Sequence, residues 1–559
     1  MSPTARRALG GLVGAAAMIA AVTVLSRVLG FVRYLAQASG LGAGVIADAY
    51  NGANVLPNVL FEVAAGGALA GAIVPLLAGP ISRGDRREVE QVASAALGWT
   101  LAVLAPLGLV LALASGPIAR VLAGLSGAAT AELIQFFLLV FAVQVPMYGA
   151  TVLAYGVLQA HKRFFWPAFA PVLSSLVVIA TYAAYGALAG GEADDPVVVG
   201  QAALRLLAWG TTAGVAAMLV PMLVPVARLG IHVRPTLRFP PGVGVRFRAL
   251  ALAGIGGVAA QQLSVVVVLL LAFARGGQGS YTPFLWAQQV YLLPYAVLVV
   301  PLATSTFPRV AAAAARRDRV GFARLSSTTT RAVLAVATAG AAAVFAAGPA
   351  VAAVFAAVAH RPGVTDEMSA ALGYLAPGVV GFAALFHVSR SLYALERARS
   401  AVLANVVGWG TVSIVALIAV PLATRSGPNP SAALAALGGA SSVGMAAGAL
   451  VALVALRRTA GAEALHGVGR TALVLVTSGV TAGWVGRWVV DAVGDLVGRG
   501  WTVALGAAAG GAVVAVLVVV AAVAAVDRGT ATGLLQAEAA RSHPAGTGTP
   551  PPPEAPRTP

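Results

Sequence analysis

The residues best suited to binding a charged ligand are two arginines in the first long apolar segment, 11–36. Arg27 and Arg33 are six residues apart, so on a helix they differ in direction by about 120° and can border one broad cavity. A charged side chain deep in a membrane span costs about 2.5–3.5 kcal/mol, which favours a polar cavity around it. Because guanidinium groups pair well with phosphate oxygens, these arginines predict a phosphate or pyrophosphate site.

The second apolar segment, 46–79, carries a polar face. Four of its residues recur at intervals of three or four, so they share one side of a helix, and that side cannot face lipid. We expect it to line the same cavity, with an acidic residue that gates or couples. The alternative is that an Arg33–Asp48 or Arg27–Glu62 pair fixes helix packing. The face consists of Asn51, Asn54, Asn58 and Glu62, and Asp48 precedes it.

The second half of the chain contains a neutral polar patch. Its glutamines can line the cavity or form hydrogen bonds between helices, and the sequence favours neither alternative. Arg390 is near the end of the segment 368–395, so we expect its guanidinium group to extend to the membrane surface. Arg487 is predicted to be structural. The patch consists of Gln261, Gln262, Gln288 and Gln289, of which Gln262 and Gln289 are candidate binding residues.

The composition is that of a membrane protein. Hydrophobic residues make up 59% of the 559 positions and charged residues 10%, whereas soluble domains carry about 25% charged residues. The net charge of +17 comes from basic residues between apolar segments, unlike the basic face of a nucleic-acid binder, so no nucleic acid is expected.

The sequence also lacks the residues of several enzyme classes. It has no cysteine and six scattered histidines, which argues against disulfides and metal sites. It contains neither a GxxxxGK[ST] loop nor a GxSxG elbow, so an ATP-driven pump or a membrane hydrolase would lack its chemistry. We therefore expect no enzyme and no cofactor, with energy drawn from an ion gradient, the membrane potential or a partner.

Fourteen membrane spans fit the hydrophobic pattern best, since about 20 apolar residues cross a bilayer. The second and ninth segments can each be read as broken, at Pro57 and at Gly348-Pro349, so the range is thirteen to fifteen. The expected spans are 11–36, 46–79, 91–115, 130–159, 165–189, 197–227, 249–274, 281–308, 325–357, 368–395, 400–424, 431–456, 470–492 and 500–526. The fold class is therefore an all-α polytopic membrane protein.

The loop charges predict the orientation. With the N-terminus in the cytoplasm, the cytoplasmic segments before the thirteenth span contain 22 basic residues and the outer loops contain five, in agreement with the positive-inside rule. We expect both termini to lie in the cytoplasm and 528–559 to form a disordered tail. The bias towards alanine, glycine, valine and arginine is typical of a GC-rich bacterial genome.

An internal duplication is visible at an offset of about 235 positions. Leu56-Pro57-Asn58 then aligns with Leu293-Pro294-Tyr295, and Val74-Pro75 aligns with Phe307-Pro308. Six spans per offset preserve the direction of insertion, so the halves should be parallel repeats with the binding site between them. We expect a first lobe at 1–229, a second lobe at 230–459 and a terminal helix pair at 460–527.

The chain resembles the MurJ/MviN family of lipid II flippases, within the multidrug/oligosaccharidyl-lipid/polysaccharide exporter superfamily. The resemblance is carried by four stretches of residues. They are Ser26-Arg27-Val28-Leu29-Gly30-Phe31-Val32-Arg33, Ala47-Asp48-Ala49-Tyr50, Leu56-Pro57-Asn58 with Gly67-Ala68-Leu69 and Val74-Pro75, and Arg163-Phe164-Phe165-Trp166-Pro167-Ala168-Phe169-Ala170-Pro171-Val172.

This resemblance implies two six-helix lobes, a C-terminal helix pair and a central cationic cavity for an undecaprenyl-pyrophosphate-linked muropeptide. It implies alternating access, in the bacterial cytoplasmic membrane, as a step of peptidoglycan synthesis. The chain departs from the family pattern at Phe61, Glu62 and Gly66, where the family has two arginines and an acid, and at Gln289, where it has an arginine. The expected spans 7, 11 and 12 contain no carboxylate, which argues against a sodium site.

Other functions stay open at this stage. The first is a flippase for another polyprenyl-linked oligosaccharide, or a drug or cation antiporter of the same superfamily. The second is a membrane scaffold that docks cell-wall enzymes and transports nothing. The expected partners are lipid II and membrane lipids, together with proteins of cell-wall synthesis.

Overall fold

The computed structural model describes residues 3–63, 70–124, 127–191, 194, 196, 198–498 and 500–526. All regular structure in these residues is helical. The predicted all-α membrane fold is therefore confirmed. Gly66 and the tail 528–559 lie outside the described residues.

The described residues of the first half of the chain form nine helices. They are α1 (Pro3–Leu41), α2 (Val45–Phe61), α3 (Ala70–Ser82), α4 (Arg86–Leu113), α5 (Ser115–Ala123), α6 (Ala128–Phe141), α7 (Gln144–Ala160), α8 (Phe165–Ala189) and α9 (Gln201–Ala227). Asp85 begins α4 with a side-chain cap, because its carboxylate accepts a hydrogen bond from the backbone N–H of Glu88.

The second half contains the remaining helices. They are α10 (Val243–Arg275), α11 (Tyr281–Pro294), the π-helical turn η3 (Tyr295–Val299), α12 (Val300–Ala315), α13 (Arg319–Val358), α14 (Val364–Leu375), α15 (Gly378–Ala394), α16 (Ala398–Ala423), α17 (Pro430–Ala460), the short 3₁₀ helix η4 (Ala462–Leu465), α18 (Val468–Val497) and α19 (Trp501–Val526).

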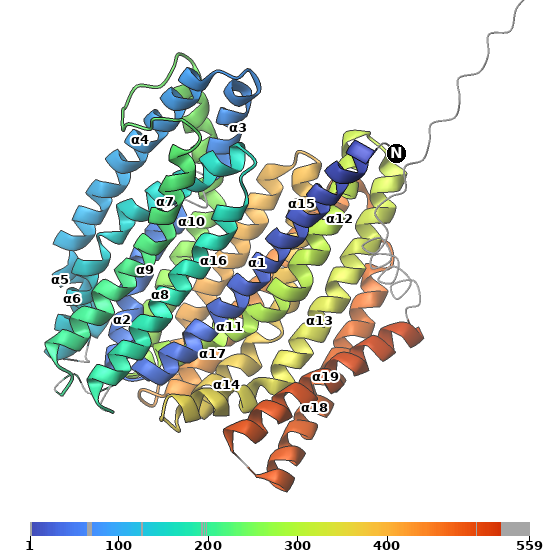
Figure 1. The fold of residues 1–559 in the computed structure, drawn as a ribbon. Helices are drawn as coiled ribbons and strands as arrows, with labels where there is room; N and C mark the ends of the chain where they lie inside the picture. The colour runs from blue at the N-terminus through green and yellow to red at the C-terminus, as the bar shows by residue number, and fades with distance from the viewer. Residues whose placement is uncertain are drawn as a thin grey trace, which may run out of the picture.

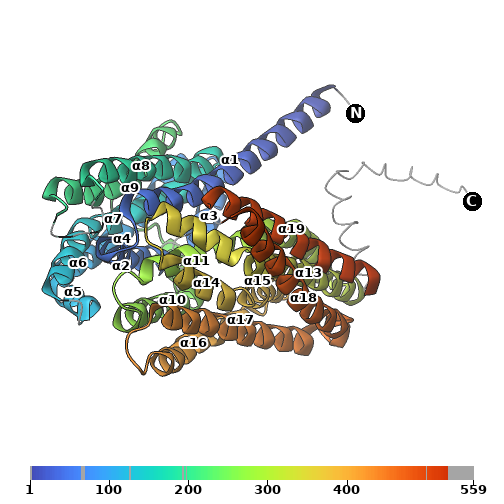
Figure 2. The ribbon, with the colours of Figure 1, turned by 90° about the horizontal axis from the view of Figure 1, so that it is seen from below.

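The helices form a bundle of long, roughly parallel rods (Figure 1). In the first half α8 packs between α1 and α9, and in the second half α17 packs against α14, α15 and α16. The terminal helices α18 and α19 pack on each other and on α13, at one edge of the bundle (Figure 2). The two halves touch where α10 meets α2, α3 and α5, where α11 meets α2, and where α1 meets α13.

Helix length and composition do not fix the number of membrane spans. Within the described residues, 11 helical stretches are long and apolar enough to cross a membrane, and 12 if the bent pair α14–α15 is one span. The first two expected spans, which correspond to α1 and to α2 with α3, are not among them. The count of fourteen therefore stays a prediction.

The breaks in the helices differ from those expected. The helix α13 runs without interruption through Gly348-Pro349, because a proline in a packed helix needs only local adjustment when neighbouring helices support the turn. The sharp bend, of 44°, lies between α14 and α15, where Pro377 cannot donate a backbone hydrogen bond. A second irregularity is η3, which follows Pro294 and has the π-helical form common at functional sites.

Small residues let α16 and α17 approach closely. A methyl group added to Gly448 would lie 3.0 Å from the carbonyl oxygen of Ala404 and 3.0 Å from the Cα atom of Gly408. The same group added to Gly410, on the other side of α16, would have no neighbour within 4 Å. Close packing of glycine faces is a common way of joining membrane helices.

We therefore expect opposite effects from two identical substitutions. Gly448→Ala should force α16 and α17 apart and lower the free energy of unfolding by about 1–3 kcal/mol. Gly410→Ala, the matched control, should be neutral or stabilising, because alanine favours a helix by up to about 1 kcal/mol over glycine. Unfolding of the purified protein in mixed detergents measures both, and equal effects would contradict the packing described.

Candidate functional site

A cavity of about 530 Å³ lies between the two halves of the chain. Arg27 and Arg33 of α1 and Gln289 of α11 are on its wall, so the structure brings these three predicted residues together. The remaining wall is mostly small, hydroxyl-bearing or apolar. It includes Thr23, Ser26, Gly30, Phe31, Tyr34, Pro167, Ala168, Pro171, Ser174, Ser175, Met218, Leu292, Leu293, Ala296 and Val297.

The two arginines differ in their surroundings. Arg27 is exposed and, within the described residues, forms no hydrogen bond or ion pair. Arg33 is half-buried; its guanidinium carbon lies 5.2 Å from the ring centroid of Tyr34, and Nη2 donates a long hydrogen bond of 3.4 Å to Oη of that residue. Neither the Arg33–Asp48 nor the Arg27–Glu62 pair forms in the described part of the chain. Most guanidinium N–H groups thus remain available to an anion.

Asp48 lies elsewhere, in a buried contact between α2 and the start of α11. Its carboxylate accepts hydrogen bonds from the backbone N–H of Tyr281 at 3.2 Å and of Thr282 at 2.8 Å, and from the Thr282 hydroxyl at 2.7 Å. The first N–H groups of a helix lack intrahelical partners and carry partial positive charge, so a carboxylate is stabilised there. Asp48 therefore joins the two halves of the chain.

A chain of buried amides and rings extends this contact. Asn51 donates to the Thr282 hydroxyl at 3.0 Å, and Gln37 of α1 donates to Oδ1 of Asn51 at 2.9 Å. The indole N–H of Trp286 donates to Oε1 of Gln37 at 2.9 Å. Sequence reasoning missed Gln37, Thr282 and Trp286, since a lone amide, threonine or tryptophan in an apolar segment has no distinctive pattern.

Arg361 closes the same end of the bundle, where α1 ends and α2, α11 and α14 begin. Its Nη1 donates to the carbonyl oxygen of Ala43 at 2.7 Å and to that of Gly279 at 2.6 Å, and its Nη2 pairs with Glu367 at 2.6 Å. One guanidinium thus holds backbone from both halves. We call this region, built around Asp48 and Arg361, the closed end.

Asp194 adds a further contact at the closed end. Its carboxylate accepts a hydrogen bond from the backbone N–H of Gly44 at 2.8 Å. Burial raises the pKa of Asp194 above its usual value, while the hydrogen bond to Gly44 and the charge of Arg361 act in the opposite direction. Sequence analysis did not single out this residue, because it stands in a polar loop where an aspartate is ordinary.

The rest of the expected polar face of α2 lines a second, smaller cavity of about 150 Å³. Asn58 and Glu62 share its wall with Gln262 and Gln288. Asn58 donates to the backbone carbonyl of Asn54 at 2.8 Å, whereas Oδ1 of Asn54 is buried and has no hydrogen-bond partner among the described residues. The polar face therefore divides between the closed end and this second cavity, and Gln288 and Gln289 face different cavities. Gln261 is half-buried and lines neither of these two cavities.

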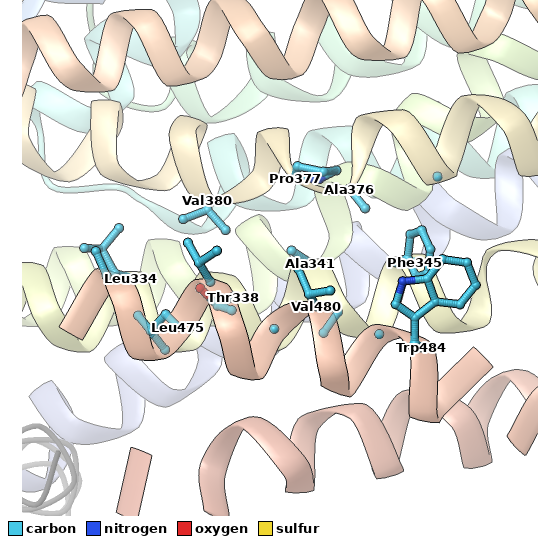
Figure 3. Close-up of a pocket in the computed structure, with 16 residues that line it drawn as sticks. Leu334, Thr338, Ala341, Phe345, Ala376, Pro377, Val380, Leu475, Val480 and Trp484 are labelled. Atoms are coloured by element: carbon cyan, nitrogen blue, oxygen red, sulfur yellow. The ribbon is translucent and has the colours of Figure 1, made fainter. Parts of the chain in front are cut away.

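A third cavity is almost wholly apolar (Figure 3). It has a volume of about 370 Å³ and lies between α13, the α14–α15 bend and α18. Among its labelled side chains, only the Thr338 hydroxyl and the Trp484 indole are polar. It can hold hydrocarbon but offers nothing to a charged group.

The remaining two arginines considered from the sequence have local partners. Arg487 pairs with Asp491, one helical turn later in α18, at 3.2 Å, which agrees with a structural role. Arg390 of α15 lies against two aromatic rings, with its guanidinium carbon 4.5 Å from the ring centroid of Phe386 and 5.6 Å from that of Phe307.

The arrangement as a whole can bind an anion in the cavity. Arg27, which has no hydrogen bond or ion pair within the described residues, and Arg33, whose hydrogen bond to Tyr34 is long, face the cavity, while hydrogen-bonded charges join the halves at the closed end. Arg27 lies fourteen residues before the end of α1, which is about 21 Å along the helix from the closed end.

Three comparisons relate the chain to known proteins. The family model described as "Lipid II flippase MurJ" matches residues 37–493. A probable lipid II flippase MurJ of Rhizobium meliloti is 31% identical over 306 residues, which cover 53% of this chain and 54% of that protein. The lipid II flippase MurJ of Burkholderia cenocepacia is 31% identical over 313 residues, covering 53% and 56%. The alignments thus span about half the length of these relatives.

Solved structures share the fold. A lipid II flippase MurJ in an inward closed conformation superposes with a TM-score of 0.69 at 16% identity, covering 89% of this chain and 97% of that chain. An inward-facing multidrug resistance MATE family transporter gives a TM-score of 0.64 at 15% identity, covering 80% and 98%.

The contact at Asp48 generates a prediction. Asp48→Asn would turn an amide N–H towards the backbone donors of α11, or leave one of them unpaired, at a cost of about 1–3 kcal/mol. The closed end should therefore separate more often. Because the chain has no cysteine, spin labels at Gln201→Cys and Ser426→Cys, one in each half, can report the distance between the halves.

In the variant, we expect a longer distance population that is weak or absent in the wild type. Asp366→Asn is the matched control, because that carboxylate is exposed near the closed end and has no hydrogen bond within the described residues. An unchanged distance distribution in Asp48→Asn would show that the contact does not hold this end closed.

Proposed function

The chain belongs to the MurJ family of lipid II flippases, and from this premise we propose that it moves lipid II across the bacterial cytoplasmic membrane by alternating access. The observation that carries the proposal is the cavity between the halves, with Arg27 and Arg33 on its wall. Two guanidinium groups with free N–H donors suit the two phosphates of a lipid-linked diphosphate.

The proposed cycle begins with the closed end sealed. The head group enters the cavity from the opposite end, its diphosphate meets Arg27 and Arg33, and Gln289 contributes a neutral polar contact. Rocking of the halves then separates Asp48 from α11 and Arg361 from its carbonyl partners. The polyprenyl tail stays in the bilayer throughout. No bond is made or broken, so the chain is a transporter and not an enzyme.

The other candidate binding residues take different parts in the proposal. Asp48 and Asn51 act at the closed end rather than on the ligand, because both side chains are buried and hydrogen-bonded to Thr282. Asn58, Glu62 and Gln262 line the second cavity, and the backbone carbonyl of Asn54 accepts a hydrogen bond from Asn58. Contact of these four residues with the ligand would require the halves to move.

We further propose the topology expected from the sequence. The lobes comprise 1–229 and 230–459, followed by the helix pair 460–527, and the cytoplasm lies opposite the closed end. The support is the excess of basic residues in alternate loops. Proteins of cell-wall synthesis are the partners to which such a transporter would hand its product.

Charge favours this function over antiport of a cationic drug. A cation site in a membrane span needs a carboxylate facing the cavity, and the described residues on the wall of the 530 Å³ cavity include none. The cavity in this MATE-like fold therefore carries positive charge, which suits an anion.

Removing both arginines tests the proposal. Arg27→Ala combined with Arg33→Ala should reduce lipid II flipping at least 100-fold, because each charge-assisted hydrogen bond contributes about 1.5–3 kcal/mol. The measurement is the exposure of lipid II at the outer face of cells depleted of the wild-type protein and of any redundant flippase.

Arg458→Ala, at an exposed helix end, is the control for loss of a basic residue and should flip normally. Flipping by the double variant at the wild-type rate would exclude the phosphate role of the two arginines. Normal flipping with loss of bound cell-wall proteins would instead favour the scaffold function.

A further inference from the structure

Arg390 is a charged residue in the apolar helix α15 of the second half of the chain. It stands in α15, one turn before that helix ends at Ala394, and its side chain is half-buried. Within the described residues it forms no hydrogen bond and no ion pair. A guanidinium has five N–H donors, so within a membrane span these donors need water or an anion.

Two aromatic rings hold the guanidinium in place. Its central carbon lies 4.5 Å from the ring centroid of Phe386 and 5.6 Å from that of Phe307. Contact with ring faces stabilises the cation and restricts its plane, while leaving the N–H groups at its edge free for paired hydrogen bonds. An arginine that only extended towards the membrane surface would not need a platform from two helices.

Arg390 is linked to the central cavity through Tyr295. The ring of Tyr295 packs on Phe382 at 4.5 Å and on Phe386 at 5.4 Å, and its hydroxyl lies within electrostatic range of both Arg390 and Arg27. Tyr295 is also the first residue of the π-helical turn η3, and its neighbours Leu293 and Ala296 are on the cavity wall.

The order of these groups along the bundle follows from the helices. The pair α14–α15 begins at the closed end and runs away from it, and Arg390 comes one turn after Phe386, which touches Tyr295. Arg390 therefore lies farther from the closed end than Tyr295. A ligand that approached from the opposite end would reach Arg390 before Arg27.

We propose that Arg390, held by Phe386 and Phe307, is a second phosphate-binding subsite, contributed by the second half of the chain. This inference rests on the proposed function. The subsite receives the diphosphate of the lipid-linked ligand before the diphosphate passes to Arg27 and Arg33. It adds a positive charge from the second half of the chain, whose residue on the cavity wall, Gln289, is neutral.

The test is binding of undecaprenyl diphosphate to the purified full chain in nanodiscs, titrated by native mass spectrometry. Arg390→Gln should weaken binding about tenfold, and Arg390→Lys should restore only part of it, because an ammonium lacks the planar fork. Arg399→Gln, an exposed arginine at the start of the next helix, is the matched control and should bind within twofold of the wild type.

The outcomes separate this inference from the proposed function. If Arg27→Gln weakens binding but Arg390→Gln does not, the subsite is refuted and the central site stands. If neither substitution weakens binding, the proposed arginine site itself fails. Titration with phosphatidylglycerol covers the other source of phosphate: if Arg390→Gln loses that lipid and keeps the diphosphate, Arg390 is a bilayer anchor and the inference is overturned.

A further variant guards against misfolding of Arg390→Gln. Phe386→Leu keeps the charge and removes one ring of the platform, so it should also weaken diphosphate binding while the thermal unfolding midpoint stays near that of the wild type. Unchanged binding in both Phe386→Leu and Arg390→Lys would contradict a subsite that depends on an oriented guanidinium.

Discussion

The contact between the Asp48 carboxylate and the first turn of α11 joins the two halves of this molecule at the closed end. A buried carboxylate is expensive unless its oxygens are hydrogen-bonded, and the first N–H groups of a helix need acceptors for the same reason. Each group satisfies the other across the boundary between halves. The chain of hydrogen bonds through Asn51, Gln37 and Trp286 depends on this contact, because it starts at Thr282 in the same turn of α11.

The opposite condition holds in the cavity. The closed end pairs its charges within the protein, with Arg361 bound to Glu367 and to two backbone carbonyls. The cavity instead presents Arg27 with no protein partner in the described residues. Charged groups that are paired within the protein thus hold one end closed, while Arg27 on the cavity wall is available to a ligand. A ligand can open such a structure only if it favours the separated state by more than the closed contacts contribute.

Much of the fold was predictable because the bilayer restricts it so strongly. Backbone groups within lipid must be paired inside helices, so a hydrophobic pattern alone gives an all-helical bundle. Arg27, Arg33 and Gln289 could be assigned to a cavity because charged and polar groups have few other places in a membrane. The position of the bend was not predictable: Gly348-Pro349 leaves α13 continuous, whereas the chain bends by 44° between Leu375 and Gly378.

The sequence by itself determined which side chains must avoid lipid, since that follows from residue type and helical period. It could not determine what each of them meets, because a partner can lie far away in the sequence, as Thr282 does from Asp48. Asp48 was expected to gate or couple at the central cavity and instead caps α11, while Gln288 and Gln289 face separate cavities. The rings of Phe386 and Phe307 beside Arg390 were likewise not predictable, and its expected extension to the membrane surface stays a prediction. Only the packing of the two halves decided which charges are neutralised internally and which remain for a ligand.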